Sequence, residues 1–74
     1  MYFQRLKDIR EDRELTQTQI ALILNMKQQQ YARYESGINE IPFSYIIKLA
    51  TFYNVPIDYL ANLTDEIKPY KRKN

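Results

Sequence analysis

The sequence contains no cysteine and no histidine, and it has only one glycine and three prolines among 74 residues. Without thiols and imidazoles the chain cannot form disulfides, zinc-finger sites, cysteine nucleophiles or histidine acid–base pairs. A chain this short makes one small domain, which is marginally stable unless its helices match well or it pairs with a second copy. We therefore expect a single domain, held by core packing, and a homodimer.

Long apolar runs are missing as well. The longest run, residues 20–24, is far shorter than the roughly 20 apolar residues that a membrane-spanning helix needs. The first residues also lack the basic region and following apolar stretch of a secretory signal. These absences predict a cytoplasmic protein with no membrane contact.

Neither positive nor negative charge is in large excess before the last residues of the chain. The net charge is +2, from 11 basic and 9 acidic residues, but four of the basic residues lie within residues 68–74. Residues 1–67 therefore carry a net charge of −2, so any argument for nucleic-acid binding must rest on where the charges lie. We expect residues 1–67 to form the domain and residues 68–74 to be a disordered basic tail with nothing to bury.

Apolar residues recur at helical spacing in five segments, and no segment alternates convincingly as a strand does. With so little glycine, breaks must also be recognised from other residues. Asn25 and Asn54 tolerate the left-handed conformation and are expected to end two helices, and Gly37 to end another. Pro42 fits the first turn of the fourth helix. The expected helices cover residues 2–13, 16–24, 28–35, 42–53 and a short stretch from about 56, an all-α fold of about five helices.

Two details of these helices can be predicted. Thr16 with Gln19 three positions later fits a capping box at the start of the second helix. Ala21 is small, as a close crossing of the second and third helices requires. The apolar stripe predicts a buried side for the fourth helix, consisting of Phe43, Ile46, Ile47, Leu49, Ala50 and Tyr53.

The second and third helices, joined by a short turn, have the layout of a DNA-reading helix-turn-helix. Gln28, Gln29, Ala32 and Arg33 fall on the outer face of the third helix. A glutamine amide can donate and accept together to adenine, an arginine can bind guanine or a phosphate, and an alanine can touch a thymine methyl group. A merely solvated polar face would show the same pattern of residues.

Several pieces together are similar to one known family. Residues 16–21, 28–37, 41–42, 49–50, 53–55 and 58–60 resemble the Cro/repressor-type helix-turn-helix family, also called the xenobiotic-response-element family. The resemblance covers about residues 3–63, nearly the whole chain. It implies a compact, lambda-repressor-like bundle whose third helix enters the major groove, usually as a dimer on a palindromic double-stranded DNA operator.

The resemblance also implies roles outside the reading face. It places DNA phosphates near Gln17, Ser36 and Asn39, and it pairs Arg10 with Glu35, although two separate exposed charges remain an alternative. Lys27 stands where serine or threonine usually caps the third helix, and we expect it to contact a phosphate. The best candidates for a dimer seam are Tyr59, Leu60, Leu63 and Ile67, with burial in the chain's own core as the alternative for the first two.

The function that these residues predict is sequence-specific transcriptional regulation, as a repressor that occupies an operator, with no cofactor, metal or catalysis. No paired-carboxylate or phosphate-loop motif indicates an enzyme. An alternative is a module that binds another protein, of the antitoxin or anti-repressor type, with DNA binding secondary or lost. Salt-dependent DNA binding would separate the two functions.

Overall fold

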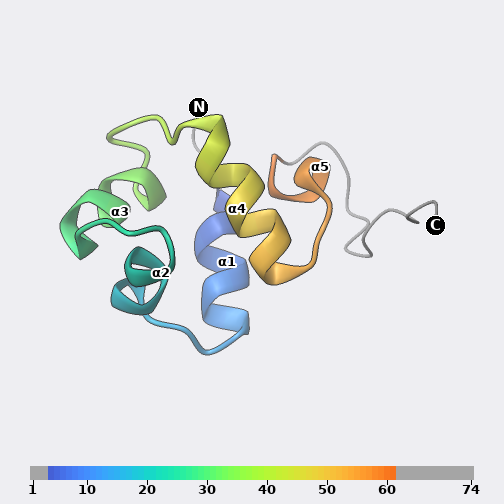
Figure 1. Cartoon of the computed structure of the whole chain (residues 1–74), viewed down its shortest axis with the longest axis horizontal. Helices are drawn as coiled ribbons and strands as arrows, with labels where there is room; N and C mark the ends of the chain where they lie inside the picture. Colours follow the sequence, from blue (N-terminus) through green and yellow to red (C-terminus); the bar gives the residue numbers. More distant parts are fainter. Residues whose placement is uncertain (1–3, 62–74) are drawn as a thin grey trace.

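The computed structural model describes residues 4–61, which form five α-helices and contain no strand (Figure 1). The helix α3 lies at one end of the long axis and α5 at the other, with α1 and α4 between them. The all-α prediction is confirmed, whereas the division at residue 67 and the tail lie outside the described residues. The helices are α1 (Gln4–Asp12), α2 (Gln17–Ile23), α3 (Gln28–Glu35), α4 (Phe43–Tyr53) and α5 (Ile57–Leu60).

The start of α2 has the predicted capping box. The Gln19 backbone N–H donates to Thr16 Oγ1 at 3.1 Å, and the Thr16 N–H donates to Gln19 Oε1 at 2.7 Å. Two N–H groups that the helix start would leave open are thus satisfied.

Four helices are followed by a left-handed residue. Glu14, Asn25 and Asn54 have φ values of 58°, 56° and 58°, and Gly37 has a φ value of 83°. After α1 the Glu14 N–H donates to Glu11 O and the Leu15 N–H to Arg10 O, both at 3.0 Å, which is a Schellman motif. The two asparagines and Gly37 were predicted in this role. The left-handed Glu14 was not.

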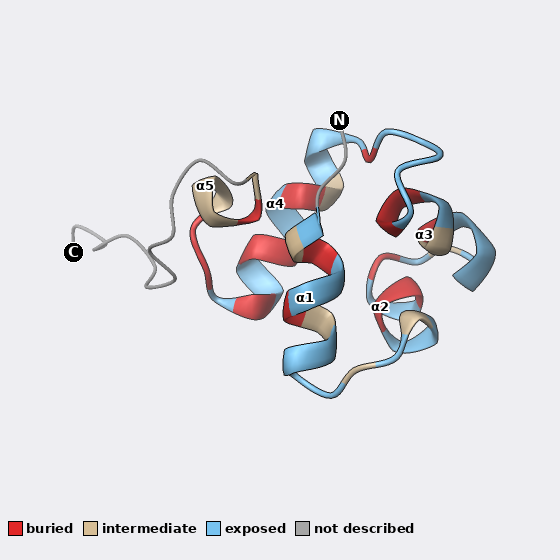
Figure 2. Cartoon of the chain, turned by 180° about the vertical axis from the view of Figure 1, so that it is seen from behind, coloured by how far each residue is buried: buried red, intermediate tan, exposed pale blue. Residues whose placement is uncertain are grey.

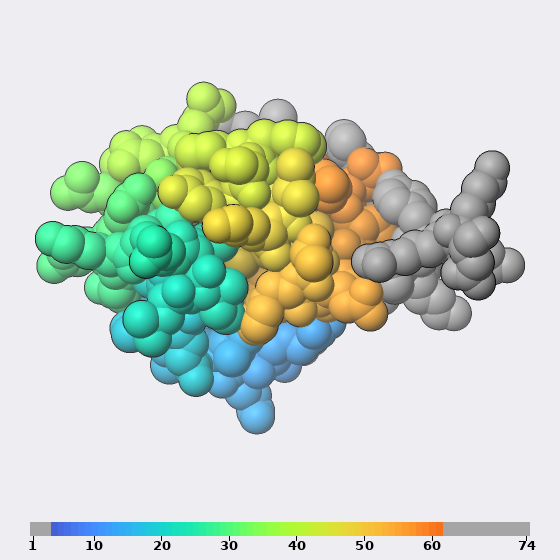
Figure 3. Space-filling view, viewed as in Figure 1, coloured from blue at the N-terminus to red at the C-terminus, as the bar shows by residue number. Residues whose placement is uncertain are grey.

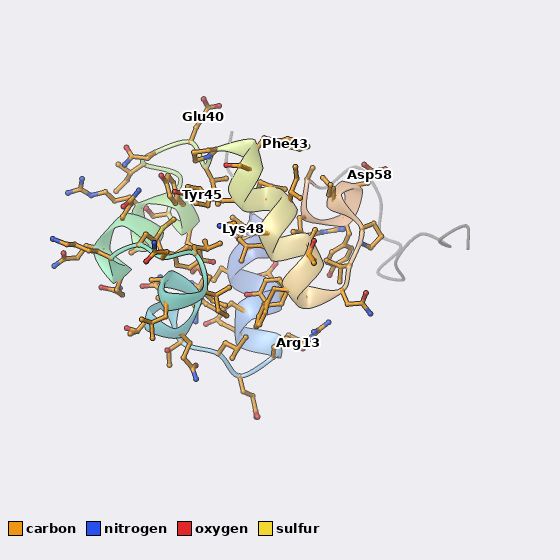
Figure 4. The ribbon with its side chains drawn as sticks, in the orientation of Figure 1. Arg13, Glu40, Phe43, Tyr45, Lys48 and Asp58 are labelled. Carbon is orange, nitrogen blue, oxygen red and sulfur yellow. The ribbon has the colours of Figure 1, made fainter. Side chains whose placement is uncertain are left out.

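The core is one cluster to which every helix contributes, and Figure 2 marks the buried residues in red along the ribbon. The buried side of α4 is narrower than predicted, because Phe43 is 63% and Ile47 43% exposed. Phe43 lies at the N-terminal end of α4, at the edge of the bundle (Figure 4). Ile47 follows the buried Ile46 in the sequence, so its side chain points to a different side of the helix and is less covered. Pro42 is also one position earlier than predicted, as the N-cap of α4. The buried apolar residues are Leu6, Ile9, Ile20, Ala21, Leu24, Tyr31, Tyr34, Ile41, Ile46, Leu49, Ala50, Tyr53, Val55 and Leu60.

The central helix α1 is tied to two helices of the C-terminal half by arginines. Arg5 Nη1 donates to Tyr59 O in α5 at 3.1 Å, and its guanidinium carbon lies 4.3 Å from the centre of the Tyr59 ring. Arg13 Nη1 donates to Tyr53 O at the end of α4 at 3.2 Å. Each contact joins a charged donor to a backbone carbonyl or an aromatic face, so α1 is fixed at both ends.

The predicted dimer seam needs a correction at Leu60. This side chain is 0% exposed and belongs to the chain's own core, so it cannot also cover a second copy without the core opening. Tyr59 is half-buried beneath Arg5, and Leu63 and Ile67 lie outside the described residues. Of the helices within residues 4–61, none has the length and apolar character needed to cross a bilayer.

Candidate nucleic-acid interface

The helices α2 and α3 form a two-helix unit joined by residues 24–27. Ile20 and Ala21 of α2 are buried where α2 packs on α3, and the Met26 N–H donates to Ala21 O at 2.9 Å to close the turn. Asn25 supplies the left-handed residue that reverses the chain. The unit therefore holds α3 at a fixed angle at the surface of the bundle.

One side of α3 is packed inward and the other faces solvent. Tyr31, Tyr34 and Glu35 are buried. Gln28, Gln29 and Arg33 are exposed and Ala32 is half-buried, so the structure brings all four predicted reading residues to one face. In the space-filling view this helix projects at the edge of the molecule (Figure 3).

The inner end of α3 is fixed to α1 by the predicted ion pair. Arg10 Nε lies 2.6 Å from Glu35 Oε2, and Arg10 Nη2 donates to Glu35 Oε1 at 3.1 Å. The two side chains are only 11% and 3% exposed. Two parallel bonds of this kind set both distance and orientation, so the pair positions α3 relative to α1.

The carboxyl of Glu35 is held in its ionised form. Burial alone would raise its pKa, but the Arg10 hydrogen bonds, with smaller contributions from Tyr31 and Gln17, outweigh burial and lower the pKa below its usual value. The carboxylate is therefore an acceptor only.

Hydrogen bonds continue from this ion pair to the outer surface. Gln17 Nε2 donates to Glu35 Oε1 at 3.3 Å, and Gln28 Nε2 donates to Gln17 Oε1 at 2.7 Å. From the sequence, Gln17 and Gln28 were given separate roles, and this connection was not predicted. Nothing in their spacing of 11 residues indicates it, because the contact depends on how α2 packs against α3.

Two open hollows flank the exposed side of α3, and the lining of each includes at least one cationic side chain. The larger one, of about 420 Å³, has Lys27 and Arg33 in its lining, with Asn39 at the loop side. The smaller one, of about 160 Å³, lies between α1, α2 and α3 and is lined by Lys7, Gln17, Ala32, Glu35 and Ser36. Lys7 was not predicted from the sequence, because the first helix was expected only to support the other helices.

The remaining predicted residues lie close to these hollows. Lys27 is the N-cap of α3 and its side chain makes no capping hydrogen bond. Ser36 and Asn39 are exposed beyond the end of α3, where the Ser36 hydroxyl and the Asn39 N–H both donate to Arg33 O at 3.2 Å. Their contact with phosphate remains a prediction.

The geometry defines a class of protein. A two-helix unit whose second helix exposes amides and a guanidinium group, between hollows lined by cationic side chains, is typical of DNA-binding proteins of the helix-turn-helix type. Within residues 4–61, no group of three or more metal-ligating side chains is arranged to hold a metal ion.

Comparison with known proteins identifies the family. A family described as helix-turn-helix matches residues 6–60. The chain is 36% identical over 75 residues to an uncharacterized HTH-type transcriptional regulator, YobD, of Bacillus subtilis (strain 168), covering 100% of this chain and 67% of that protein. It is 30% identical over 73 residues to the cryptic phage CTXphi transcriptional repressor RstR of Vibrio cholerae, covering 92% of this chain and 66% of that one.

A solved structure agrees with this assignment. The crystal structure of a transcriptional regulator from Listeria innocua matches with a TM-score of 0.72 at 26% identity, over 96% of this chain and 64% of that chain. The chain belongs to the Cro/C1-type helix-turn-helix family of DNA-binding transcriptional regulators, which is not a class of enzymes. It spans about two thirds of the length of these relatives.

Proposed function

We propose that this protein is a cytoplasmic repressor that binds a palindromic operator as a homodimer, with α3 in the major groove. The observation that carries the proposal is the outward face of α3, where Gln28, Gln29 and Arg33 are exposed on a helix whose other side is packed. Repression then needs no chemistry, because a protein bound at an operator excludes other proteins from it.

The residues divide into two kinds of contact. Gln28, Gln29, Ala32 and Arg33 read base edges, and a second set of residues around the two hollows binds the phosphates on either side of the groove, since base contacts specify and phosphate contacts position. The phosphate-contacting residues are Gln17, Lys27, Ser36 and Asn39, to which the structure leads us to add Lys7.

Replacing the reading amides tests this function. Gln28→Ala and Gln29→Ala should each cost about 1–3 kcal/mol on the preferred operator and leave affinity for random DNA almost unchanged. The operator is first selected from a random DNA library, and binding is then measured by fluorescence anisotropy at low and high salt. Gln4→Ala, which removes an exposed amide from α1, should leave both affinities as they are. Equal losses on both DNAs would show that Gln28 and Gln29 do not read bases.

A protein partner of the antitoxin or anti-repressor type is a second candidate function. It is favoured by large apolar side chains that the fold leaves exposed, among them Leu22 on α2 and Phe43, Ile47 and Phe52 on α4. The salt titration decides between the two functions, because a DNA reader must lose affinity as salt rises. Absence of any salt-dependent DNA binding would leave the protein-binding function.

A further inference from the structure

Charge is distributed unevenly among the helices. Residues 4–14, which form α1 and the turn after it, contain four basic and four acidic residues. Residues 15–26, which include α2, contain no charged residue, and residues 41–57, which include α4, contain only Lys48. The helices α2 and α4 therefore form a nearly uncharged part of a protein whose other helices are charged.

The two uncharged helices adjoin on one face of the molecule. In the space-filling view the end of α2 (teal) and α4 (yellow to orange) meet on the side turned to the viewer, and α1 (blue) reaches only the lower edge (Figure 3). Seen from behind, α1 lies in front of α4 (Figure 2). We call the uncharged surface the α2–α4 face, and its exposed residues are Leu22, Ile23, Ile47, Lys48, Thr51 and Phe52.

Large apolar side chains are uncovered on the α2–α4 face. Leu22, Ile23, Ile47 and Phe52 are between 40% and 74% exposed. Single exposed apolar residues are ordinary, but a group of them on one face marks a surface that binds a protein. Lys48 does not oppose such binding, because a lysine can lay its stem on apolar atoms and keep its ammonium group in solvent.

The lack of charge indicates which protein fits this face. Two identical copies related by a two-fold axis place the same surface on both sides of their contact, so a strongly charged surface would repel itself. The α2–α4 face, with one charged residue, avoids this repulsion. A different protein is selected largely by complementary charges, for which this face offers only Lys48.

We propose that a second copy of this chain covers the α2–α4 face, so that α2 and α4, rather than α5, hold the homodimer. The inference rests on the proposed function, which includes a homodimer, and it names the interface. The residues of α3 that read DNA stay open in such a dimer, because α3 lies at one end of the long axis (Figure 1).

Crosslinking through single cysteines tests where the copies meet. The chain has no cysteine, so each variant carries one thiol per copy. Thr51→Cys places it on the α2–α4 face, Ala61→Cys after α5, and Glu11→Cys on the exposed side of α1. With a short bifunctional maleimide and micromolar protein, Thr51→Cys should form covalent dimers at least about tenfold faster than the other two, because thiols held in one contact have a raised effective concentration.

Added charge on the face should separate the copies. Leu22→Lys and Phe52→Lys each place a cation near the C-terminal end of a helix, where it does not oppose the helix dipole. Each should raise the dimer Kd about tenfold or more in sedimentation of the free protein, because charges are depleted at the centre of protein interfaces. Ile38→Lys is the matched control, since Ile38 is 73% exposed in the loop before α4, and it should leave the dimer Kd unchanged.

The outcomes separate the inference from the function, with thermal melts to confirm that each variant folds. If Thr51→Cys crosslinks no faster than Glu11→Cys, or if both lysine variants pair as the parent does, the inference is overturned. Operator binding is measured separately by fluorescence anisotropy, so the DNA-reading function can stand when the inference fails. If a lysine variant does not fold, the crosslinking rates decide. A parent that stays monomeric with and without operator DNA overturns the inference and the homodimer together.

Discussion

At the scale of single residues, Lys27 conflicts with the stability of its own helix. A lysine at an N-cap cannot accept a hydrogen bond from the open N–H groups, and its charge is repelled by the positive end of the helix dipole. Lys27→Ser should therefore raise the free energy of unfolding by about 0.5–1.5 kcal/mol. It should also weaken binding to every DNA sequence and reduce the salt slope by about one unit.

A denaturant melt of the free protein and a salt titration of the complex measure the two effects. Lys48→Ser is the matched control, because Lys48 is exposed on α4, away from α3 (Figure 4). This control should change neither quantity. A gain in stability with an unchanged salt slope for Lys27→Ser would mean that Lys27 points away from DNA.

Glu35 predicts an acid limit to stability. Its pKa is lowered in the folded protein, so the folded state binds a proton less readily than the unfolded state, whose glutamates titrate near about 4.3. The stabilisation by Glu35 is complete above that pH and is lost as pH falls toward the folded pKa. Urea melts between pH 6 and pH 3 should show this decline, and Glu35→Gln should reduce its slope. An unchanged slope would mean that other carboxyl groups cause the decline. Glu11→Gln, at an exposed carboxyl on α1, controls for the removed charge.

The hydrogen bonds around Gln17 could not be predicted from the sequence, whereas the exposed face of α3 could. Gln28, Gln29 and Arg33 could be placed on one face because helical periodicity alone decides which side chains share a face. The bonds from Glu35 through Gln17 to Gln28 join three places that are distant along the chain. Such contacts depend on the distance between packed helices, which no local pattern determines.

At the scale of the helices, Glu14 occupies a backbone conformation that its side chain disfavours. A non-glycine residue in the left-handed region costs roughly 1–2 kcal/mol, and glycine removes this cost while adding freedom to the unfolded chain. Glu14→Gly should therefore raise the free energy of unfolding by about 0.5–1 kcal/mol.

Chemical denaturation can measure this gain against a close comparison. Asn25→Gly changes a residue with nearly the same φ, 56° against 58°, and should gain less because asparagine tolerates this region. A loss of stability for Glu14→Gly would show that its side chain makes a contact worth more than the backbone cost.

The ends of helices were easier to predict than their buried sides. The bounds of α3, 28–35, agree with the prediction because Asn25 and Gly37 mark breaks on both sides. Glu14 could not be predicted, because glutamate is not a residue that marks a left-handed position. Ile47 was predicted to be buried from its apolar character, but burial on α4 also depends on which neighbours cover it.

At the scale of the whole molecule, the proposed dimer sets the geometry of the operator. A reading helix of 8 residues reaches only a few base pairs, so two copies must lie on one face of the duplex, with half-site centres about 10 bp apart. Sedimentation with footprinting should show two protected half-sites and two chains per operator. A monomer that protects one half-site would contradict this arrangement. Because Leu60 is occupied in the core, variants that test the seam should change Tyr59, Leu63 or Ile67.

The arginines in and directly after α1 also determine when the fold can form during synthesis. Arg10, Arg13 and Arg5 reach partners that follow them by 25, 40 and 54 residues along the chain. A growing chain on the ribosome therefore holds a first helix whose partners have not yet been made, and the last of them is Tyr59. The domain therefore cannot fold helix by helix from its N-terminus. We expect it to stay open to proteases and chaperones until residues 57–60 have left the exit tunnel, and then to fold in a single step.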